Sequence, residues 1–397
     1  MDIVQLSDVC TIGNGFAFKS TQFKSTGIPL LKISNIINER VSFEGRTVYL
    51  DESMLLTQQD FVVNKGDVVI ALSGATTGKY GVYQLDTPCL LNQRIGVIRQ
   101  ADSEHLDLRY FYFYLNELKS EILRKAQGAA QPNISTKDIG RFKIPLPSLA
   151  EQKKIAEILD AADSLRQKNQ QLIEHYTVLS QSLFLDMFGD PVTNPKGWDE
   201  IKLNDGCSKI SVGFVGVCEP FYTDKTGVPM IRTGNLSDNG LKLRALKYVT
   251  KEFHDKQKKS QLLKGDLLIA RHGDNGKAVL FKGEFDAANC LNIVILRVNS
   301  TDLNDLYTQY YLNNENTRKL IQSRTGGATQ KVINTKEIQK LMVPAPPIKL
   351  QESFAERIDA IEKQKQQAQA SLKKTEALFN SLLQRAFKGD LTESKAV

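Results

Sequence analysis

The chain has 397 residues, of which 41% are hydrophobic and 24% charged, and its formal net charge is +7. This composition is typical of a folded, soluble protein with two or three domains. No run of about 18 uninterrupted apolar residues occurs, which excludes a membrane-spanning helix. The modest positive charge permits a polyanionic partner without proving one.

The opening MDIVQLSDVC lacks the basic and apolar regions of a secretory signal. The five cysteines are scattered and form no C-x-x-C pair, which is typical of reduced thiols. We therefore expect a cytoplasmic protein without a disulfide framework.

Residues 1–146 contain short β-branched runs separated by Gly, Asn and Asp turns, with an aromatic helical patch at 108–115 (LRYFYFYL). This pattern predicts an α+β domain with a β-rich core. Proline then marks the end of the domain in 144–147 (IPLP), because it disfavours helix in the residue before it and suits a helix start.

A glycine-rich stretch in this domain, 71–81 (ALSGATTGKYG), looks at first like a phosphate-binding loop. That motif needs four residues between its glycines and a hydroxyl side chain after the lysine. Here three residues separate Gly74 from Gly78, and Tyr80 occupies the hydroxyl position. We therefore reject an ATPase and interpret the stretch as a recognition loop on a fixed scaffold.

Residues 147–190 form one long predicted helix that ends at a glycine cap, Gly189. Its apolar residues recur with alternating steps of three and four, as in the seam of a coiled coil. The predicted seam is Ile155, Ile158, Ala162, Leu165, Asn169, Leu172, Tyr176, Leu179 and Leu183.

The remainder of the chain repeats what precedes it. Residues 62–71 (VVNKGDVVIA) return as 261–270 (QLLKGDLLIA), and 131–139 (QPNISTKDI) return as 330–338 (QKVINTKEI), both shifted by 199 positions. The protein is therefore a tandem duplication of a unit of about 200 residues. The second glycine-rich loop keeps its place, but only two residues lie between its glycines.

The duplication predicts a second α+β domain at 191–345 and a second long helix within 346–397. The second predicted seam is Phe354, Ile358, Ile361, Lys365, Ala368, Leu372, Phe379 and Leu382. We expect the two helices to pair as an antiparallel coiled coil, with polar Asn169 and Lys365 fixing the register. The alternative is two independent surface helices.

The sequence contains no pattern typical of an active site. The four histidines never fall at metal-ligand spacing, and neither an H-E-x-x-H nor a G-x-S-x-G motif occurs. We therefore expect no catalytic residue and no bound metal.

The segment 144–155 (IPLPSLAEQKKI), followed by 182–190 (SLFLDMFGD), resembles the specificity subunit of type I restriction-modification enzymes, and the resemblance covers the whole chain. The second copy is looser, because 344–347 (PAPP) keeps the prolines while 350–351 (LQ) replaces the Glu-Gln pair. The openings of the two domains also fit this family, at 4–10 (VQLSDVC) and 201–207 (IKLNDGC).

This resemblance implies a non-catalytic DNA reader that serves restriction and DNA methylation. Two target recognition domains would each take one half of a split, asymmetric site, with the helices as the spacer between them. The helices would also dock two methyltransferase subunits, and the full assembly would add two restriction-translocase subunits, in a bacterial or archaeal cytoplasm. S-adenosylmethionine, ATP and Mg²⁺ would belong to those partners, and this chain would bind no cofactor.

Helix length is compatible with that arrangement. A helix over 149–187 would be roughly 58 Å long at a rise of ~1.5 Å per residue, whereas one turn of DNA is ~34–36 Å. Because the loops of the two copies differ, with ATTGKY in one and DNGKA in the other, we expect the two half-sites to differ in sequence.

The candidate DNA contacts are residues whose side chains suit bases or phosphates. In the first domain they are Lys32, Asn35, Thr76, Thr77, Lys79, Tyr80, Gln93, Arg94, Gln131 and Asn133. In the second they are Arg232, Asn235, Arg271, His272, Asn275, Lys277, Gln330 and Lys331. The alternative for each is a solvated loop residue or a hydrogen bond within a turn.

Other functions stay open at this point. Within the same family, the alternative is that the chain serves a methylation-only or phage-defence system rather than full restriction. A stand-alone nuclease or methyltransferase would cleave or methylate DNA by itself, and a coiled-coil scaffold would bind duplexes without sequence preference or steep salt dependence.

Overall fold

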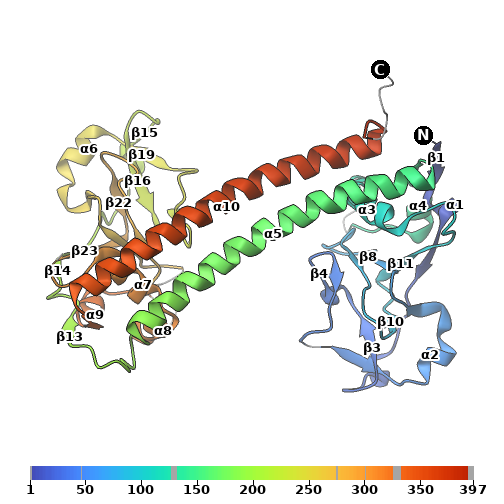
Figure 1. The fold of residues 1–397 in the computed structure, drawn as a ribbon, viewed down its shortest axis with the longest axis horizontal. Helices are drawn as coiled ribbons and strands as arrows, with labels where there is room; N and C mark the ends of the chain where they lie inside the picture. Colours follow the sequence, from blue (N-terminus) through green and yellow to red (C-terminus); the bar gives the residue numbers. More distant parts are fainter. Residues whose placement is uncertain are drawn as a thin grey trace. The chain divides into compact units, whose positions relative to one another are not determined.

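The computed structural model describes residues 2–45, 47–126, 132–273, 276–299, 301–324 and 332–391. The chain divides into two compact units, Met1–Lys168 with Ser371–Val397, and Asn169–Ala370. Each unit contains one α+β domain together with parts of two long helices, α5 (Leu149–Phe188) and α10 (Ile348–Lys388) (Figure 1). No helix among the described residues is both long and apolar enough to span a membrane.

The domain of the first unit is built on mixed sheets. One sheet has the strand order β2-β11-β8-β9-β5-β4 and another β6-β3-β10-β7, while β1 pairs with β12. Pairing is antiparallel except for β3 with β10 and β5 with β9. The elements are β1 (Asp2–Gln5), α1 (Leu6–Val9), β2 (Cys10–Asn14), η1 (Ser20–Gln22), β3 (Ile28–Leu31), η2 (Ile33–Asn35), β4 (Ile36–Ile37), β5 (Arg40–Val41), β6 (Val48–Leu50), α2 (Met54–Thr57), η3 (Gln59–Phe61), β7 (Val62–Val63), β8 (Val68–Ala71), β9 (Tyr80–Val82), β10 (Cys89–Leu91), β11 (Ile95–Gln100), α3 (Leu108–Ala126), α4 (Thr136–Gly140) and β12 (Lys143–Leu146).

The domain of the second unit repeats this plan. Its sheets have the orders β14-β23-β20-β21 and β15-β19-β16-β22, with the pairs β17-β18 and β13-β24; β14 and β23 lie side by side in Figure 1. The elements are β13 (Glu200–Lys202), β14 (Cys207–Val212), η4 (Glu219–Phe221), β15 (Tyr222–Thr223), β16 (Val228–Arg232), η5 (Thr233–Asn235), β17 (Leu236–Ser237), β18 (Gly240–Leu241), β19 (Lys247–Val249), α6 (Lys251–Lys256), η6 (Lys258–Ser260), β20 (Leu267–Ala270), β21 (Ala278–Leu280), β22 (Asn289–Leu291), β23 (Ile293–Val298), α7 (Asp305–Asn313), α8 (Glu315–Ser323), α9 (Thr335–Gln339) and β24 (Met342–Pro344).

The central strands are buried on both faces, which explains their continuous apolar sequence. In β8, Val68 and Ile70 enter the core that also holds α3, whereas Val69 enters the core between the two sheets. Successive side chains of a strand point to opposite faces, so every residue of this run is buried. The strand β20 divides its side chains between two cores in the same way.

The aromatic helix of each domain is held by tyrosine. The hydroxyl of Tyr110 in α3 donates to the carbonyl of Pro145 at 2.7 Å, and that of Tyr307 in α7 donates to the carbonyl of Pro344 at 2.7 Å. In the first unit this region is one helix, α3. In the second unit it is two helices, α7 and α8, which are separated by Asn314, and the Asn314 side chain caps α8. These bonds join the aromatic helix to the strand that precedes each long helix.

A buried glutamine fixes the start of α5. The Gln152 side chain donates to the carbonyls of His105 at 2.7 Å and Pro147 at 2.9 Å, and it accepts the N–H of Asp107 at 2.8 Å. Its neighbour Glu151 is exposed and caps the helix instead. The glutamine therefore carries the structural role of the Glu-Gln pair.

The second long helix begins in the same way. Gln351 donates to the carbonyls of Asp302 at 3.0 Å and Pro346 at 2.7 Å, and it accepts the N–H of Asn304 at 2.9 Å. This explains why the looser second motif keeps its glutamine while a leucine replaces the glutamate.

Within each unit the two long helices run antiparallel, as predicted. In the first unit the early residue Ile155 of α5 shares a core with Leu383 near the end of α10. In the second, Phe188 at the end of α5 packs against Phe354 at the start of α10, with ring centroids 5.2 Å apart. The glycines after the helices adopt positive φ, 79° at Gly189 and 88° at Gly389, which is the predicted left-handed cap.

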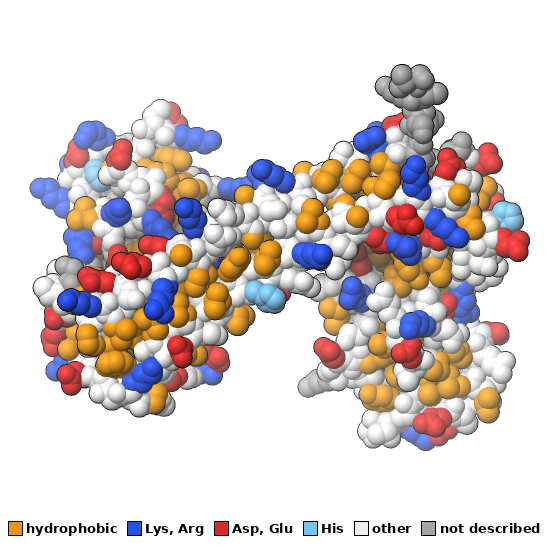
Figure 2. Space-filling view, in the orientation of Figure 1, with side chains coloured by type: hydrophobic (Ala, Val, Ile, Leu, Met, Phe, Trp, Pro, Cys, Tyr) orange, Lys and Arg blue, Asp and Glu red, His pale blue; other side chains and the backbone are white. Residues whose placement is uncertain are grey.

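The buried line of α5 differs from the predicted seam. Leu165, Leu172 and Leu179 are 48%, 43% and 49% exposed, whereas Leu159 and Ser180, on the adjacent line, are 0% and 3% exposed. Figure 2 shows hydrophobic side chains reaching the surface along the long helices. The predicted line and the buried line share every other position. At the positions that differ, the sequence pattern selected the more apolar residues, and Leu165, Leu172 and Leu179 among them are exposed.

Polar residues occupy the inner line of α5 because they have local partners. The Arg166 guanidinium donates to Asp163 at 2.9 Å and lies over the Phe379 ring, with its side chain still 42% exposed. The buried Ser180 hydroxyl donates to the carbonyl of Tyr176 at 2.9 Å. Satisfied polar groups tolerate burial. The predicted polar seam residues are buried, since Asn169 and Lys365 are each 7% exposed.

The remaining seam residues divide by depth. Those that are fully or nearly buried are Ile155, Ala162, Phe354, Ile358 and Ala368. Those that are partly buried are Ile158, Tyr176, Leu183, Ile361, Leu372, Phe379 and Leu382. The pattern of α10 thus follows its buried face more closely than the pattern of α5.

Candidate nucleic-acid interface

The glycine-rich turn of the first domain closes on itself and packs against the segment before α4. The N–H of Ala71 donates to the carbonyl of Lys79 at 2.8 Å. The Thr77 hydroxyl donates to the carbonyls of Gly74 at 2.8 Å and Pro132 at 2.9 Å. Gly74 has a φ of 91°, a conformation that glycine adopts without strain. The turn is therefore held by main-chain bonds together with the Thr77 hydroxyl, and its tip is exposed.

The loop between β10 and β11 lies beside this turn. Gln93 and Arg94 are exposed there, and the N–H of Leu72 donates to the carbonyl of Arg94 at 2.9 Å. The N–H of Asn92 donates to the last carbonyl of β3 at 3.1 Å, immediately before Lys32. Three of the predicted segments, far apart in the sequence, thus meet at one end of the domain.

The second domain assembles the corresponding segments with different bonds. The Arg271 guanidinium donates to the carbonyl of Ile333 at 3.2 Å and to the side-chain oxygen of Asn292 at 2.7 Å. The Lys277 ammonium forms an ion pair with Asp238 at 2.8 Å, and its side chain is only 13% exposed. Arg271 therefore joins the glycine-rich turn to the loop between β22 and β23.

The two interfaces share a frame but not their tips. The N–H of Ala71 reaches Lys79 at 2.8 Å and that of Ala270 reaches Lys277 at 2.9 Å, although the first turn encloses one residue more. The loop from β10 to β11 spans three residues, and the loop from β22 to β23 consists of Asn292 alone. Similar scaffolds therefore present loops of different length and chemistry.

Some predicted contact residues use their polar groups inside the protein. Asn35 accepts the N–H of Lys32 at 2.9 Å and donates to the carbonyl of Ser42 at 3.2 Å. Asn235 makes the same bonds with Arg232 at 3.0 Å and Lys242 at 3.2 Å. Both asparagines are buried. This geometry favours the turn role over a contact with a base.

Thr77 and Tyr80 are also buried, each 4% exposed. The Tyr80 hydroxyl donates to the side-chain oxygen of Asn116 at 3.2 Å, and burial raises the pKa of this phenol far above its ordinary value. The buried side chains of both residues therefore stabilise the turn from inside the domain.

The other predicted contacts lie nearer the surface. Those that are exposed are Thr76, Gln93, Arg94 and Asn133. Those that are half-buried are Lys32, Lys79, Arg232, Arg271, His272 and Lys277. Gln131, Asn275, Gln330 and Lys331 lie outside the described residues.

Sequence reasoning missed residues that the fold brings to this end of the second domain. Asn292 holds Arg271, and Lys242 and Arg244 follow the turn that Asn235 closes. The repeat contains the signal for the two basic residues, which is a difference in charge between the copies. A shift of 200 positions aligns Ser42 with Lys242 and Glu44 with Arg244.

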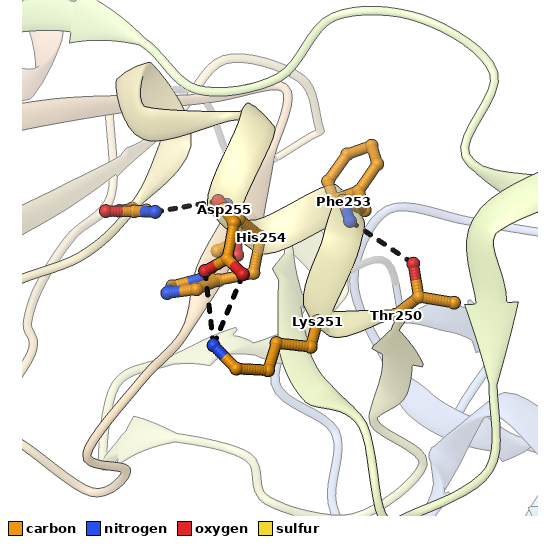
Figure 3. A network of polar contacts seen from close by, with 7 residues as sticks. Thr250, Lys251, Phe253, His254 and Asp255 are labelled. Atoms are coloured by element: carbon orange, nitrogen blue, oxygen red, sulfur yellow. Dashed lines mark hydrogen bonds and ion pairs between the residues drawn. The ribbon is translucent and has the colours of Figure 1, made fainter.

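The region around α6 is stabilised by local contacts (Figure 3). Thr250 caps the helix by accepting the N–H of Phe253 at 3.2 Å, and Lys251 pairs with Asp255 at 3.2 Å. The His254 ring lies 2.6 Å from the side-chain oxygen of the buried Asn289. These polar side chains therefore have structural partners, and the described residues contain no cluster of metal-ligating side chains.

Comparison with known proteins agrees with this architecture. The model of the type I restriction modification DNA specificity domain matches residues 1–175 and again 195–374. The type I restriction enzyme EcoBI specificity subunit of Escherichia coli is 24% identical over 421 residues, which cover 98% of this chain and 86% of that protein. The MjaVIII specificity subunit of Methanocaldococcus jannaschii is 34% identical over 182 residues, 44% of this chain and 42% of that protein.

Solved structures show the same fold. The S subunit of a type I restriction-modification system from M. genitalium superposes with a TM-score of 0.59 at 16% identity, over 97% of this chain and 96% of that one. A chain from a study of type I restriction-modification assembly gives a TM-score of 0.58 at 20% identity, over 98% of both chains. The family model covers most of the sequence in two copies, so this chain belongs to the type I restriction modification DNA specificity domain family.

Proposed function

We propose that this chain is the DNA-specificity subunit of a type I restriction-modification system, and that its two domains read different halves of one target. The observation that carries the proposal is that the two domains repeat one scaffold, while the loops at the end of each domain differ. The turns share their main-chain bonds, whereas the length and the side chains of the loops differ. Two similar readers with different contact surfaces suit a bipartite, asymmetric target.

The exposed side chains at the tips have the chemistry for this task. Amides such as those of Gln93 and Asn133 pair with adenine, and a guanidinium group such as that of Arg94 pairs with guanine in the major groove. Lysines such as Lys79 suit phosphates and position the protein without reading sequence. In this proposal the hydrogen-bonded main chain fixes the backbone of these loops before DNA binds, which lowers the entropic cost of binding.

The long helices have a second role in the proposal. The helices α5 and α10 run through both units and would set the number of base pairs between the half-sites. The half-exposed line of Leu165, Leu172 and Leu179 would dock a methyltransferase subunit, since exposed apolar lines on a helix mark partner surfaces. Assembly with two methyltransferase and two restriction-translocase subunits would supply S-adenosylmethionine, ATP and Mg²⁺ chemistry, and this chain would contribute no catalytic step.

Selection from a pool of random duplexes tests the proposal. The complex of this chain with its methyltransferase subunit is expected to enrich two defined blocks of bases separated by unspecified ones. Replacing Arg94 by Ala is expected to change one block only. Recovery of a single contiguous block, or of no enriched sequence, would overturn the assignment.

A further inference from the structure

A pocket of about 610 Å³ opens beside β16 in the second domain. It is lined by Arg232, Gly234, Asn235, Lys242, Leu243, Arg244 and Ala245. The described residues that line it include three cations and no carboxylate, and none of these cations forms an ion pair with a described residue.

The Arg232 side chain has unused hydrogen-bonding capacity in this pocket. Its Nε atom is buried and donates to no partner among the described residues. Its Nη2 atom makes only a long contact, 3.4 Å, with the carbonyl of Ala245. A buried donor without an acceptor is costly, and a shift of the Arg232 side chain that brings its guanidinium to an anion in the pocket would remove that cost.

The first domain has the same backbone here but a different charge. The side chain of Asn35 donates to the carbonyl of Ser42 at 3.2 Å, and that of Asn235 to the carbonyl of Lys242 at 3.2 Å. Across this matched turn, Glu44 of the first copy stands where the second has Arg244. The positive pocket is therefore a property of the second domain and not of the shared fold.

The pocket adjoins the tip of the second interface. Arg232 ends β16 and pairs with Leu291 in parallel register, and the next residue, Asn292, holds Arg271. An extended polyanion bound at this tip would also reach the pocket and contact both places. A small free anion would contact the pocket alone.

We propose that Arg232, Lys242 and Arg244 form an anchor for a backbone phosphodiester of DNA, present only in the second domain. The proposal rests on the proposed function of the chain. The planar guanidinium of Arg232 suits the phosphate oxygens, and the two neighbouring cations add charge. This anchor holds the second half of the target in register without reading its bases.

The test exchanges the residues of the two copies in the full chain, assembled with its methyltransferase subunit. One variant carries Lys242→Ser with Arg244→Glu, and a matched variant carries Ser42→Lys with Glu44→Arg. A third, milder variant, Arg232→Lys, keeps the positive charge and removes the planar guanidinium with its paired N–H donors. Unfolding curves establish that each variant remains folded.

Duplex affinity is then measured by fluorescence anisotropy over a range of salt, on the target and on an unrelated sequence. The first variant is expected to bind both duplexes more weakly by the same factor. The slope of log affinity against log salt should become shallower by about 0.9, the value for one lost phosphate contact. The reciprocal variant should steepen the slope.

An unchanged slope would overturn the anchor, and so would a loss confined to duplexes with one half-site sequence, which would indicate base reading. Titration with inorganic phosphate distinguishes a DNA phosphate from a small free anion. If free phosphate binds the wild type and not the variant while duplex binding is unchanged, the pocket serves a small anion. Failure of the wild-type complex to prefer any sequence would instead refute the proposed function.

Discussion

Replacing Gln351 by Leu should destabilise the second unit by about 3 kcal/mol. The side chain is 0% exposed, and its hydrogen bonds to Asp302, Pro346 and Asn304 measure 3.0, 2.7 and 2.9 Å. Each such bond contributes about 1 kcal/mol net, and the abandoned main-chain groups stay buried. Leucine has a similar size and helix propensity, so the decrease in the free energy of unfolding measures the loss of these hydrogen bonds.

Urea unfolding followed by tryptophan fluorescence measures this effect. The chain has one tryptophan, Trp198, whose indole N–H donates to the carbonyl of Phe188 at 3.0 Å in the second unit. With a denaturant dependence of about 2 kcal/mol per molar, the midpoint should fall by about 1.5 M. The matched control, Gln364→Leu, changes an exposed position of the same helix and should stay within about 0.5 kcal/mol. Equal losses in both variants, or no loss at Gln351, would refute the reasoning.

Three further outcomes are expected. Replacing Leu172 and Leu179 together by Ser should leave the unfolding midpoint nearly unchanged, because both are about half exposed, while co-elution with the methyltransferase subunit in size-exclusion chromatography is lost; retained co-elution would place docking elsewhere. Arg94→Ala should cost about 1–3 kcal/mol of base discrimination in one half-site, and an equal loss in both half-sites would contradict its role as a reader. Burial raises the pKa of Tyr310 to about 12, so the folded state keeps its proton where the unfolded state has lost it. The corresponding stability is complete below about pH 10 and is lost as pH rises towards 12, and Tyr310→Phe should make the alkaline loss shallower by up to about 1.4 kcal/mol per pH unit; an identical slope would show that another group titrates.

The repeat carried most of the prediction of the fold. Two copies of one pattern imply two copies of one domain, and the structure has the matching strands β8 and β20 buried along their whole length. Helix limits also followed from local chemistry, since proline precedes each long helix and Gly189 and Gly389 end them with positive φ. These features depend on neighbours in the sequence, which a pattern records.

What the sequence could not show depends on contacts between distant segments. The inner line of α5 includes Arg166 and Ser180 because each finds a partner, and hydrophobicity alone favoured the outer leucines. Asn35 is a candidate DNA contact because an amide suits adenine, whereas the fold uses its amide to close a turn, which is the alternative that the sequence left open. The basic pocket forms only because that turn brings Lys242 back beside Arg232.

The central claim is that two similar domains read two different sequences. Sequencing that detects methylated bases, on DNA from cells producing this chain with its methyltransferase subunit, tests it most directly. The account predicts methylation within a two-part target whose halves differ and are separated by a fixed number of unspecified base pairs. A contiguous target, or a target with two identical halves, would contradict it.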